Sequence, residues 1–111
     1  MTWADRGVYS LGIPLEGIGM IKRQATSNGK VKVTFSLPLD MAPSATSVTG
    51  DFNDWNPLAT PMKKRSNGTR SASIELEAGS ATCFKYLADG GSWFNDPDVE
   101  VDGEGNNWLV A

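Results

Sequence analysis

The chain of 111 residues contains no histidine and only one cysteine, Cys83. Zinc sites in proteins draw on several Cys and His ligands, so these counts exclude an ordinary zinc site within the chain. They also exclude Ser–His and Cys–His nucleophile pairs, because no imidazole is present to act as the base. A single cysteine cannot form an intramolecular disulfide, which agrees with a reducing compartment. The sequence therefore predicts no metal site, no cofactor and no catalytic nucleophile.

The chain also lacks a basic excess and any long apolar run. Ten Lys and Arg against 13 Asp and Glu give a net charge of −3, whereas nucleic-acid binding needs a basic patch to displace counterions. The basic run Lys63-Lys64-Arg65 is interpreted as a solvated loop. No segment approaches the ~20 apolar residues that span a bilayer, and the first twenty residues do not resemble a signal peptide. We expect a cytoplasmic protein without a nucleic-acid or membrane partner.

From residue 21 onward the chain consists of short segments of alternating polarity separated by turn residues. Apolar and polar residues alternate in 30–37 and again in 70–77, which is the period of half-buried strands. Asn28-Gly29 between two such segments predicts a hairpin. The expected strands are 21–25, 30–37, 47–50, 70–77, 82–89 and 107–110. No segment shows sustained helical periodicity, so the sequence predicts an all-β sandwich of antiparallel strands in a single domain.

Residues 1–19 differ in composition, because five glycines and prolines interrupt them and no clear period remains. Two interpretations stay open. The segment is either an N-terminal extension before a second start site at Met20, with the sandwich in residues 20–111, or an extra strand or loop that covers one edge of the sandwich.

An indole lies among turn-forming residues in the segment Gly50-Asp51-Phe52-Asn53-Asp54-Trp55-Asn56-Pro57. Asn, Asp, Gly and Pro favour loops, because their side chains bond the local backbone or fix its dihedral angles. Trp55 is therefore expected on an exposed loop, where aromatic side chains usually serve binding. In the alternative interpretation it packs over its own loop against Pro57 or Met62.

Strand alternation supplies partners for this indole. If Phe84 and Tyr86 face the core, Lys85 between them faces outward. The next turn delivers a second indole, Trp93, and the loop before the last strand carries Asn106. Indole rings can cover the apolar faces of a sugar ring, while ammonium and amide groups bond its hydroxyls. The predicted carbohydrate-binding residues are Trp55, Lys85, Trp93 and Asn106.

Simpler interpretations exist for several of these residues. Lys85 can be an ordinary solvated lysine, and Trp93 can cap one end of the sandwich. Trp108 in the last strand is interpreted as a packing residue. The carboxylates Asp51, Asp54 and Asp89 are interpreted as turn-stabilising groups rather than as the acid/base pair of a glycosidase. No catalytic residue is predicted.

The order and spacing of these motifs resemble carbohydrate-binding module family 48. This is the glycogen-binding or isoamylase N-terminal early set domain of glycogen branching and debranching enzymes and of the β subunit of AMP-activated protein kinase. The motifs that carry the resemblance, within about residues 30–110, are Gly50–Pro57, Met62, Phe84-Lys85-Tyr86, Asp89-Gly90, Trp93, Asn95-Asp96-Pro97 and Gly105-Asn106-Asn107. The resemblance implies an immunoglobulin-like sandwich that binds α-1,4-linked glucans such as glycogen without chemistry of its own. Trp55 and Trp93 would stack on the sugars, and Lys85 and Asn106 would bond them.

Two features depart from the family pattern. Asp102 and Glu104 stand where the kinase-type members carry an apolar residue and a threonine, so an apolar contact with the sugar would be lost. An extra glycine in Asp89-Gly90-Gly91-Ser92 lengthens the turn and can shift Trp93. The changes at Asp102 and Glu104 favour the alternative of an interaction or regulatory module that docks onto a glucan-metabolising enzyme and has little sugar affinity. We expect a monomer or a weak homodimer.

Overall fold

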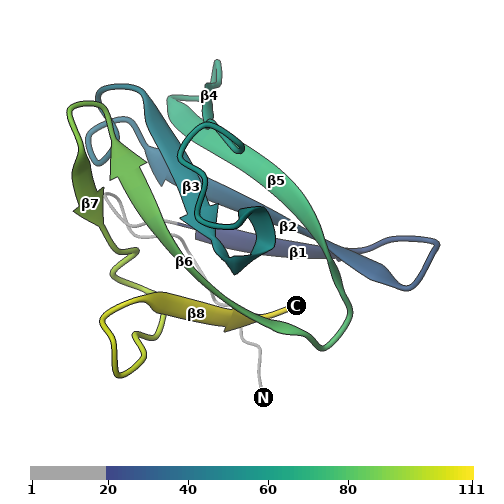
Figure 1. The fold of residues 1–111 in the computed structure, drawn as a ribbon. Coiled ribbons are helices and arrows are strands. Elements are labelled where there is room, and N and C mark those ends of the chain that lie inside the picture. Colours follow the sequence, from purple (N-terminus) through teal and green to yellow (C-terminus); the bar gives the residue numbers. More distant parts are fainter. Residues whose placement is uncertain (1–19) are drawn as a thin grey trace.

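The structure, a computed structural model, describes residues 20–111 and contains two antiparallel β-sheets packed against each other (Figure 1). In sheet A the strand order is β1 (Met20–Ala25), β2 (Lys30–Pro38), β5 (Thr69–Glu77) and β4 (Lys63–Lys64). Sheet B contains β3 (Thr46–Gly50), β6 (Ala81–Ala88) and β7 (Ser92–Phe94), and β8 (Asn107–Val110) also pairs with β6. A 3-10 turn, η1 (Asp51–Asn53), follows β3, and the described part of the chain has no α-helix. The prediction of an all-β antiparallel sandwich is confirmed, whereas both interpretations of residues 1–19 lie outside the described residues.

The core lies between the sheets and is built from the inward positions of the alternating strands. Phe35 of β2 forms an edge-to-face pair with Phe84 of β6, with ring centroids 4.9 Å apart, and stacks on Phe52 of η1 at 5.9 Å. Tyr86 extends this aromatic cluster toward Phe94 of β7 at 5.3 Å. The other core residues with exposures of 7% or less are Val33, Leu37, Ala42, Val48, Met62, Ala72 and Leu109. The alternation predicted for 30–37 and for the Phe84 strand is confirmed.

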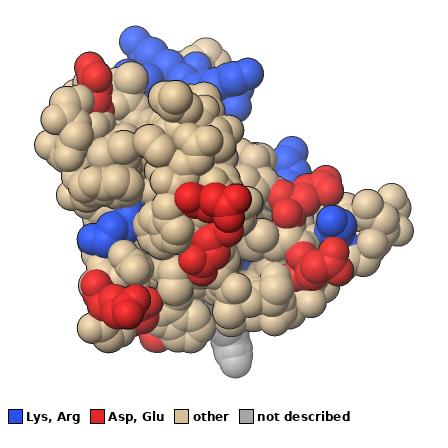
Figure 2. All heavy atoms as spheres, in the orientation of Figure 1, with Lys and Arg blue, Asp and Glu red and all other residues tan. Residues whose placement is uncertain are grey.

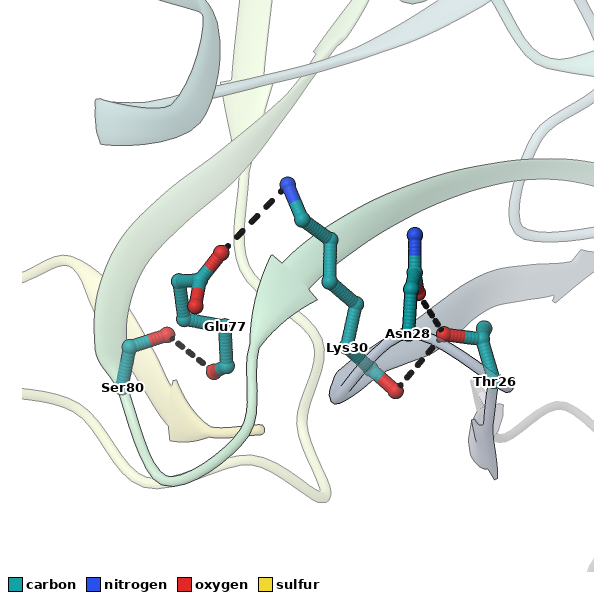
Figure 3. A network of polar contacts seen from close by, with 5 residues as sticks. All are labelled: Thr26, Asn28, Lys30, Glu77 and Ser80. Carbon is teal, nitrogen blue, oxygen red and sulfur yellow. Dashed lines mark hydrogen bonds and ion pairs between the residues drawn. The ribbon is translucent and has the colours of Figure 1, made fainter.

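The β1–β2 hairpin forms as Asn28-Gly29 predicted. Gly29 adopts a positive φ of 79°, and Thr26 N donates to Lys30 O at 2.9 Å. The Thr26 hydroxyl lies 2.5 Å from Asn28 Oδ1 and 3.1 Å from Lys30 O (Figure 3). The Lys30 ammonium reaches Glu77 of β5 at 3.4 Å, so this network joins the hairpin to the last residue of its neighbouring strand (Figure 3).

Two short strands were not predicted. Lys63 and Lys64 were interpreted as part of a solvated loop, but they pair with Ser71 and Arg70 at the edge of sheet A while staying exposed. Just before them, Met62 N donates to Thr46 O at 2.8 Å, so the chain crosses from the edge of sheet B to the edge of sheet A. This crossing closes one side of the sandwich. The second short strand, β7, carries one of the predicted site residues.

Strand β6 is the central element of sheet B. Its C-terminal half pairs with β3 on one side and with β7 on the other, and its N-terminal half pairs with β8. Phe84 has Gly50 as its partner in β3 and Asn107 as its partner in β8, so β3 and β8 lie on opposite sides of β6.

Within residues 20–111 no helix is long and apolar enough to cross a bilayer.

Candidate functional site

The outer face of sheet B carries the predicted lysine and one predicted tryptophan. Phe84 and Tyr86 are fully buried in the core, so Lys85 and Leu87 project from the opposite face of β6. Leu87 pairs with Trp93 of β7, and residues directly opposite each other in an antiparallel pair share a face. Trp93 is 49% exposed, which leaves much of its indole open to a ligand.

The extra glycine before Trp93 is absorbed by the turn. Gly90 and Gly91 adopt positive φ angles of 92° and 91°, which glycine accepts without a Cβ penalty. Gly91 N donates to Ala88 O at 3.0 Å, and Ala88 pairs with Ser92, so the register of β7 on β6 is kept. The longer turn therefore leaves Trp93 on the face that carries Lys85.

Trp55 is held on a loop at the β3 side of β6. Its backbone N donates to Gly50 O at 2.9 Å, and its indole Nε1 donates to Asp51 Oδ1 at 3.1 Å. The second oxygen of Asp51 accepts from Cys83 N of β6 at 3.0 Å. This backbone N–H lies just beyond the point where β3 ends, so Asp51 takes the place of a further strand residue. Trp55 is half-buried. The Asp51 carboxylate links its indole to the backbone of Cys83, which lies two residues before Lys85 in β6.

The backbone of this loop is strained at the indole. Asp54 and Trp55 both have φ of 57°, the left-handed region that non-glycine residues rarely adopt. Such a conformation costs about 1–3 kcal/mol per residue and persists only where the surroundings fix it. Asn53 supplies that fixation, because its side-chain oxygen accepts from Gly50 N at 3.1 Å and its amide donates to Val48 O at 3.1 Å. Strain of this kind commonly marks functional loops.

Asn106 comes from a loop on the other side of β6. Asn107 is fully buried and pairs with Phe84, so the alternation of an extended chain directs the preceding Asn106 toward the outer face. Asn106 itself is half-buried, and its backbone is fixed by Asp102. Asp102 N donates to Asn106 O at 2.8 Å, and Asn106 N donates to Asp102 Oδ1 at 3.0 Å.

Asp102 therefore stabilises its own loop. Its Oδ1 also accepts from Glu104 N at 2.8 Å, and its Oδ2 accepts from the Cys83 thiol at 3.3 Å. Hydrogen bonds from the backbone, that of Asn106 first, lower the pKa of Asp102 below its usual value. Partial burial, followed by the hydrogen bond and charge of Asp102, raises the pKa of Cys83 to about 11. The acidic residue thus shapes the loop that presents Asn106, while Glu104 is exposed.

A buried polar network supports the same loop from below. Asn107 Oδ1 accepts from Asp96 N at 2.6 Å, and its amide donates to the carbonyl oxygens of Asp96 and Val99 at 3.2 and 3.1 Å. Asp96 Oδ2 and the Tyr86 hydroxyl are buried without a hydrogen-bond partner among the described residues. Burial raises the pKa of Asp96, and burial together with the charge of Asp96 raises that of Tyr86.

The structure adds Trp108 to this face. Trp108 of β8 pairs with Cys83, so its half-buried side chain lies on the outer face. A hollow of about 230 Å³, which we call the Trp108 notch, is lined by Asp51, Ala81, Thr82, Cys83, Asp102 and Trp108. Alternation in the last strand could have indicated this position of Trp108. Asn107 and Leu109 are buried, so Trp108 and Val110 between and after them face outward.

Two of the four predicted residues, Lys85 and Trp93, thus come from adjacent strands of one sheet face, and the loops that carry Trp55 and Asn106 border it. Lys85 lies at the centre, with Trp93 and Asn106 on the β7–β8 side and Trp55 on the β3 side.

Figure 2 shows basic side chains gathered at the top of the view, over the β4 corner, and acidic ones over the middle and lower parts. The described residues contain no group of three or more His, Cys, Asp or Glu able to hold a metal ion.

No family model matches the chain. Over 81 residues it is 35% identical to an amylopullulanase from Thermoanaerobacterium thermosulfurigenes. The match takes in 70% of this chain and 4% of that protein, so the chain spans only a small part of the relative's length. The finding relates this small all-β domain to one segment of a large carbohydrate-active enzyme.

The arrangement offers aromatic surface and hydrogen-bonding groups on an open sheet face. An indole can cover the apolar C–H face of a ring, while the Lys85 ammonium donates and the Asn106 amide both donates and accepts. These groups suit an uncharged, hydroxyl-rich ligand.

Proposed function

We propose that this chain is a non-catalytic module that binds α-1,4-linked glucans such as glycogen, with sugar rings stacking on Trp55 and Trp93. Lys85 and Asn106 bond the hydroxyl rims of the same rings. The observation that carries the proposal is the strand register of sheet B. It supports one continuous surface in which an exposed indole, a lysine and an amide are neighbours. The similarity to a segment of amylopullulanase supports a glucan as the ligand class.

An open surface of this kind binds short sugars weakly, since it encloses little of the ligand. A branched glucan presents many chain ends, and multivalency raises the effective concentration at each site. We therefore propose that the module acts on polymeric glucan, and we propose the cytoplasm as its location.

The test is native electrophoresis through gels with and without glycogen. Covering roughly 60 Å² of an indole face contributes about 1.5 kcal/mol at 25 cal/mol per Å². Trp55→Ala and Trp93→Ala should therefore each raise the dissociation constant for glycogen, obtained from the retardation, about tenfold. Leu58→Ala is the matched control, because Leu58 is a non-aromatic apolar side chain of the same loop and is 86% exposed. Loss of retardation in both tryptophan variants, but not in the control, supports the proposal. Equal retardation of all four proteins would refute it.

A second function is favoured by one observation, the match to 4% of a much longer protein. Under this alternative the sandwich is an interaction or regulatory module that docks onto a glucan-metabolising enzyme and has little sugar affinity of its own. A folded wild-type protein that glycogen does not retard, and that co-migrates with such an enzyme in size-exclusion chromatography, would favour it.

A further inference from the structure

We propose that the Trp108 notch is an additional sugar subsite, which extends the glucan-binding surface along β6 and makes it selective for longer chains. This inference rests on the proposed function. It assigns Trp108 a ligand contact, with its indole stacking on a glucose ring while Asp51 and Asp102 accept hydroxyl hydrogens.

The notch is continuous with the residues already assigned to the ligand. Asp51, on one side, holds the Trp55 indole at 3.1 Å. Asp102, on the other side, holds the backbone of Asn106 at 3.0 Å. Cys83, which also lines the notch, is two residues before Lys85 on the same face of β6. A ligand that extends from Lys85 along this face toward Cys83 therefore reaches the notch.

The carboxylates retain capacity for a ligand. An ionised carboxylate offers about four acceptor positions, and Asp51 uses one on each oxygen, for Trp55 Nε1 and Cys83 N. Among residues 20–111, Asp102 Oδ2 accepts only from the Cys83 thiol, at 3.3 Å. Two carboxylates disfavour an anion through like-charge repulsion. The free acceptors therefore match hydroxyl groups, the donors that a neutral sugar supplies.

The dimensions match a chain of several sugars. Trp93 pairs with Leu87 and Trp108 pairs with Cys83, four residues apart on β6. At about 3.3 Å per residue these two positions are separated by about 13 Å. The notch, at about 230 Å³, is smaller than the roughly 300–1,000 Å³ of pockets for drug-sized ligands, so it suits one ring of a longer ligand.

The test measures dissociation constants of the full chain for linear maltooligosaccharides of two to seven glucose units by isothermal titration. Wild type should bind maltoheptaose more tightly than maltotriose. In Trp108→Ala we expect the constant for maltoheptaose to rise about tenfold and that for maltotriose to change less than twofold. Trp108→Phe, which keeps a flat ring, should stay within about threefold of wild type for both sugars. Unchanged binding in Trp108→Ala, or an equal loss at every length, would overturn the inference.

A second measurement needs no substitution and so does not depend on a variant folding. Cys83 lines the notch, so saturating maltoheptaose should slow its alkylation by iodoacetamide at pH 9 several-fold. An alkylation rate that the sugar leaves unchanged would contradict the subsite.

The subsite and the proposed function can fail separately. If Trp93→Ala abolishes binding while Trp108→Ala keeps the full length dependence, the subsite is wrong and the proposed function stands. If wild type binds neither maltoheptaose nor glycogen, both fail.

Discussion

Replacing Asn53 by alanine should destabilise the protein by about 3 kcal/mol. Its side chain makes three hydrogen bonds, to Gly50 N at 3.1 Å, Val48 O at 3.1 Å and Thr60 Oγ1 at 2.9 Å. Each such bond contributes about 1 kcal/mol net. Val48 and Gly50 are buried, so their backbone groups would be left without these partners. For a domain of this size the loss corresponds to a fall in Tm of about 10–20 °C.

Urea unfolding followed by tryptophan fluorescence measures this effect directly. Asn67→Ala is the matched control, because Asn67 is an exposed loop asparagine whose side chain, within the described part of the chain, makes a single hydrogen bond, accepted from the Thr69 hydroxyl at 2.7 Å. Asn67→Ala should change the free energy of unfolding by no more than about 0.5 kcal/mol. Because Asn53 also fixes the strained turn before Trp55, the folded Asn53→Ala protein should bind glycogen less tightly than the control does.

A double-mutant cycle with Thr60→Val shows whether the bonding pattern is the cause. Thr60→Val removes one of the three bonds and should cost about 1 kcal/mol in wild type but almost nothing in the Asn53→Ala background. Full additivity of the two losses, or a cost below about 1 kcal/mol for Asn53→Ala alone, would refute the reasoning.

Two further predictions follow from the pKa shifts. Because burial raises the pKa of Asp96, the folded state holds this proton more tightly than the unfolded state. Stability should therefore fall as pH rises from about 4 through the folded pKa; Asp96→Asn should remove that fall in urea unfolding between pH 3.5 and 7, and an unchanged slope would contradict the assignment. The Cys83 pKa of about 11 predicts slow alkylation at pH 8 that rises steeply toward pH 11. Asp102→Asn should lower that pKa and speed alkylation at pH 8, and an equal or slower rate would contradict the contact.

The longer strands could be predicted from sequence because their packing repeats a local period. In β2 the inward residues are apolar and their neighbours are polar, and in β6 the aromatic Phe84 and Tyr86 flank the outward Lys85, so both strand and face follow from the alternation. β8 was predicted with its observed bounds. β4 and β7 contain two and three residues, too few for a period to appear. Their pairing depends on neighbouring strands that are distant in sequence.

The candidate site also has features that the sequence could predict and features that it could not. Alternation was sufficient to direct Lys85 outward, but the position of Trp93 depends on a turn of positive-φ glycines that keeps the register. By the family resemblance, Asp102 stands where an apolar residue would contact the ligand. Its carboxylate instead accepts two backbone N–H groups and a thiol within and beside its own loop. The two backbone bonds are local, but the thiol bond joins residues 19 positions apart, and no local pattern encodes that contact.

The core and the outer face of sheet B are set by the same register. A one-residue slip of β6 would turn Lys85 into the core and expose Tyr86, because neighbouring residues of a strand face opposite sides. Position 50 accepts only glycine in this register, since a Cβ there would collide with the Cys83 carbonyl and approach the Phe52 ring to 2.7 Å. The close approach of β3 to β6 at Gly50 also brings Asp51 to Cys83 N, which positions Trp55. Packing of the aromatic core therefore fixes the geometry of the surface on which the proposed ligand lies.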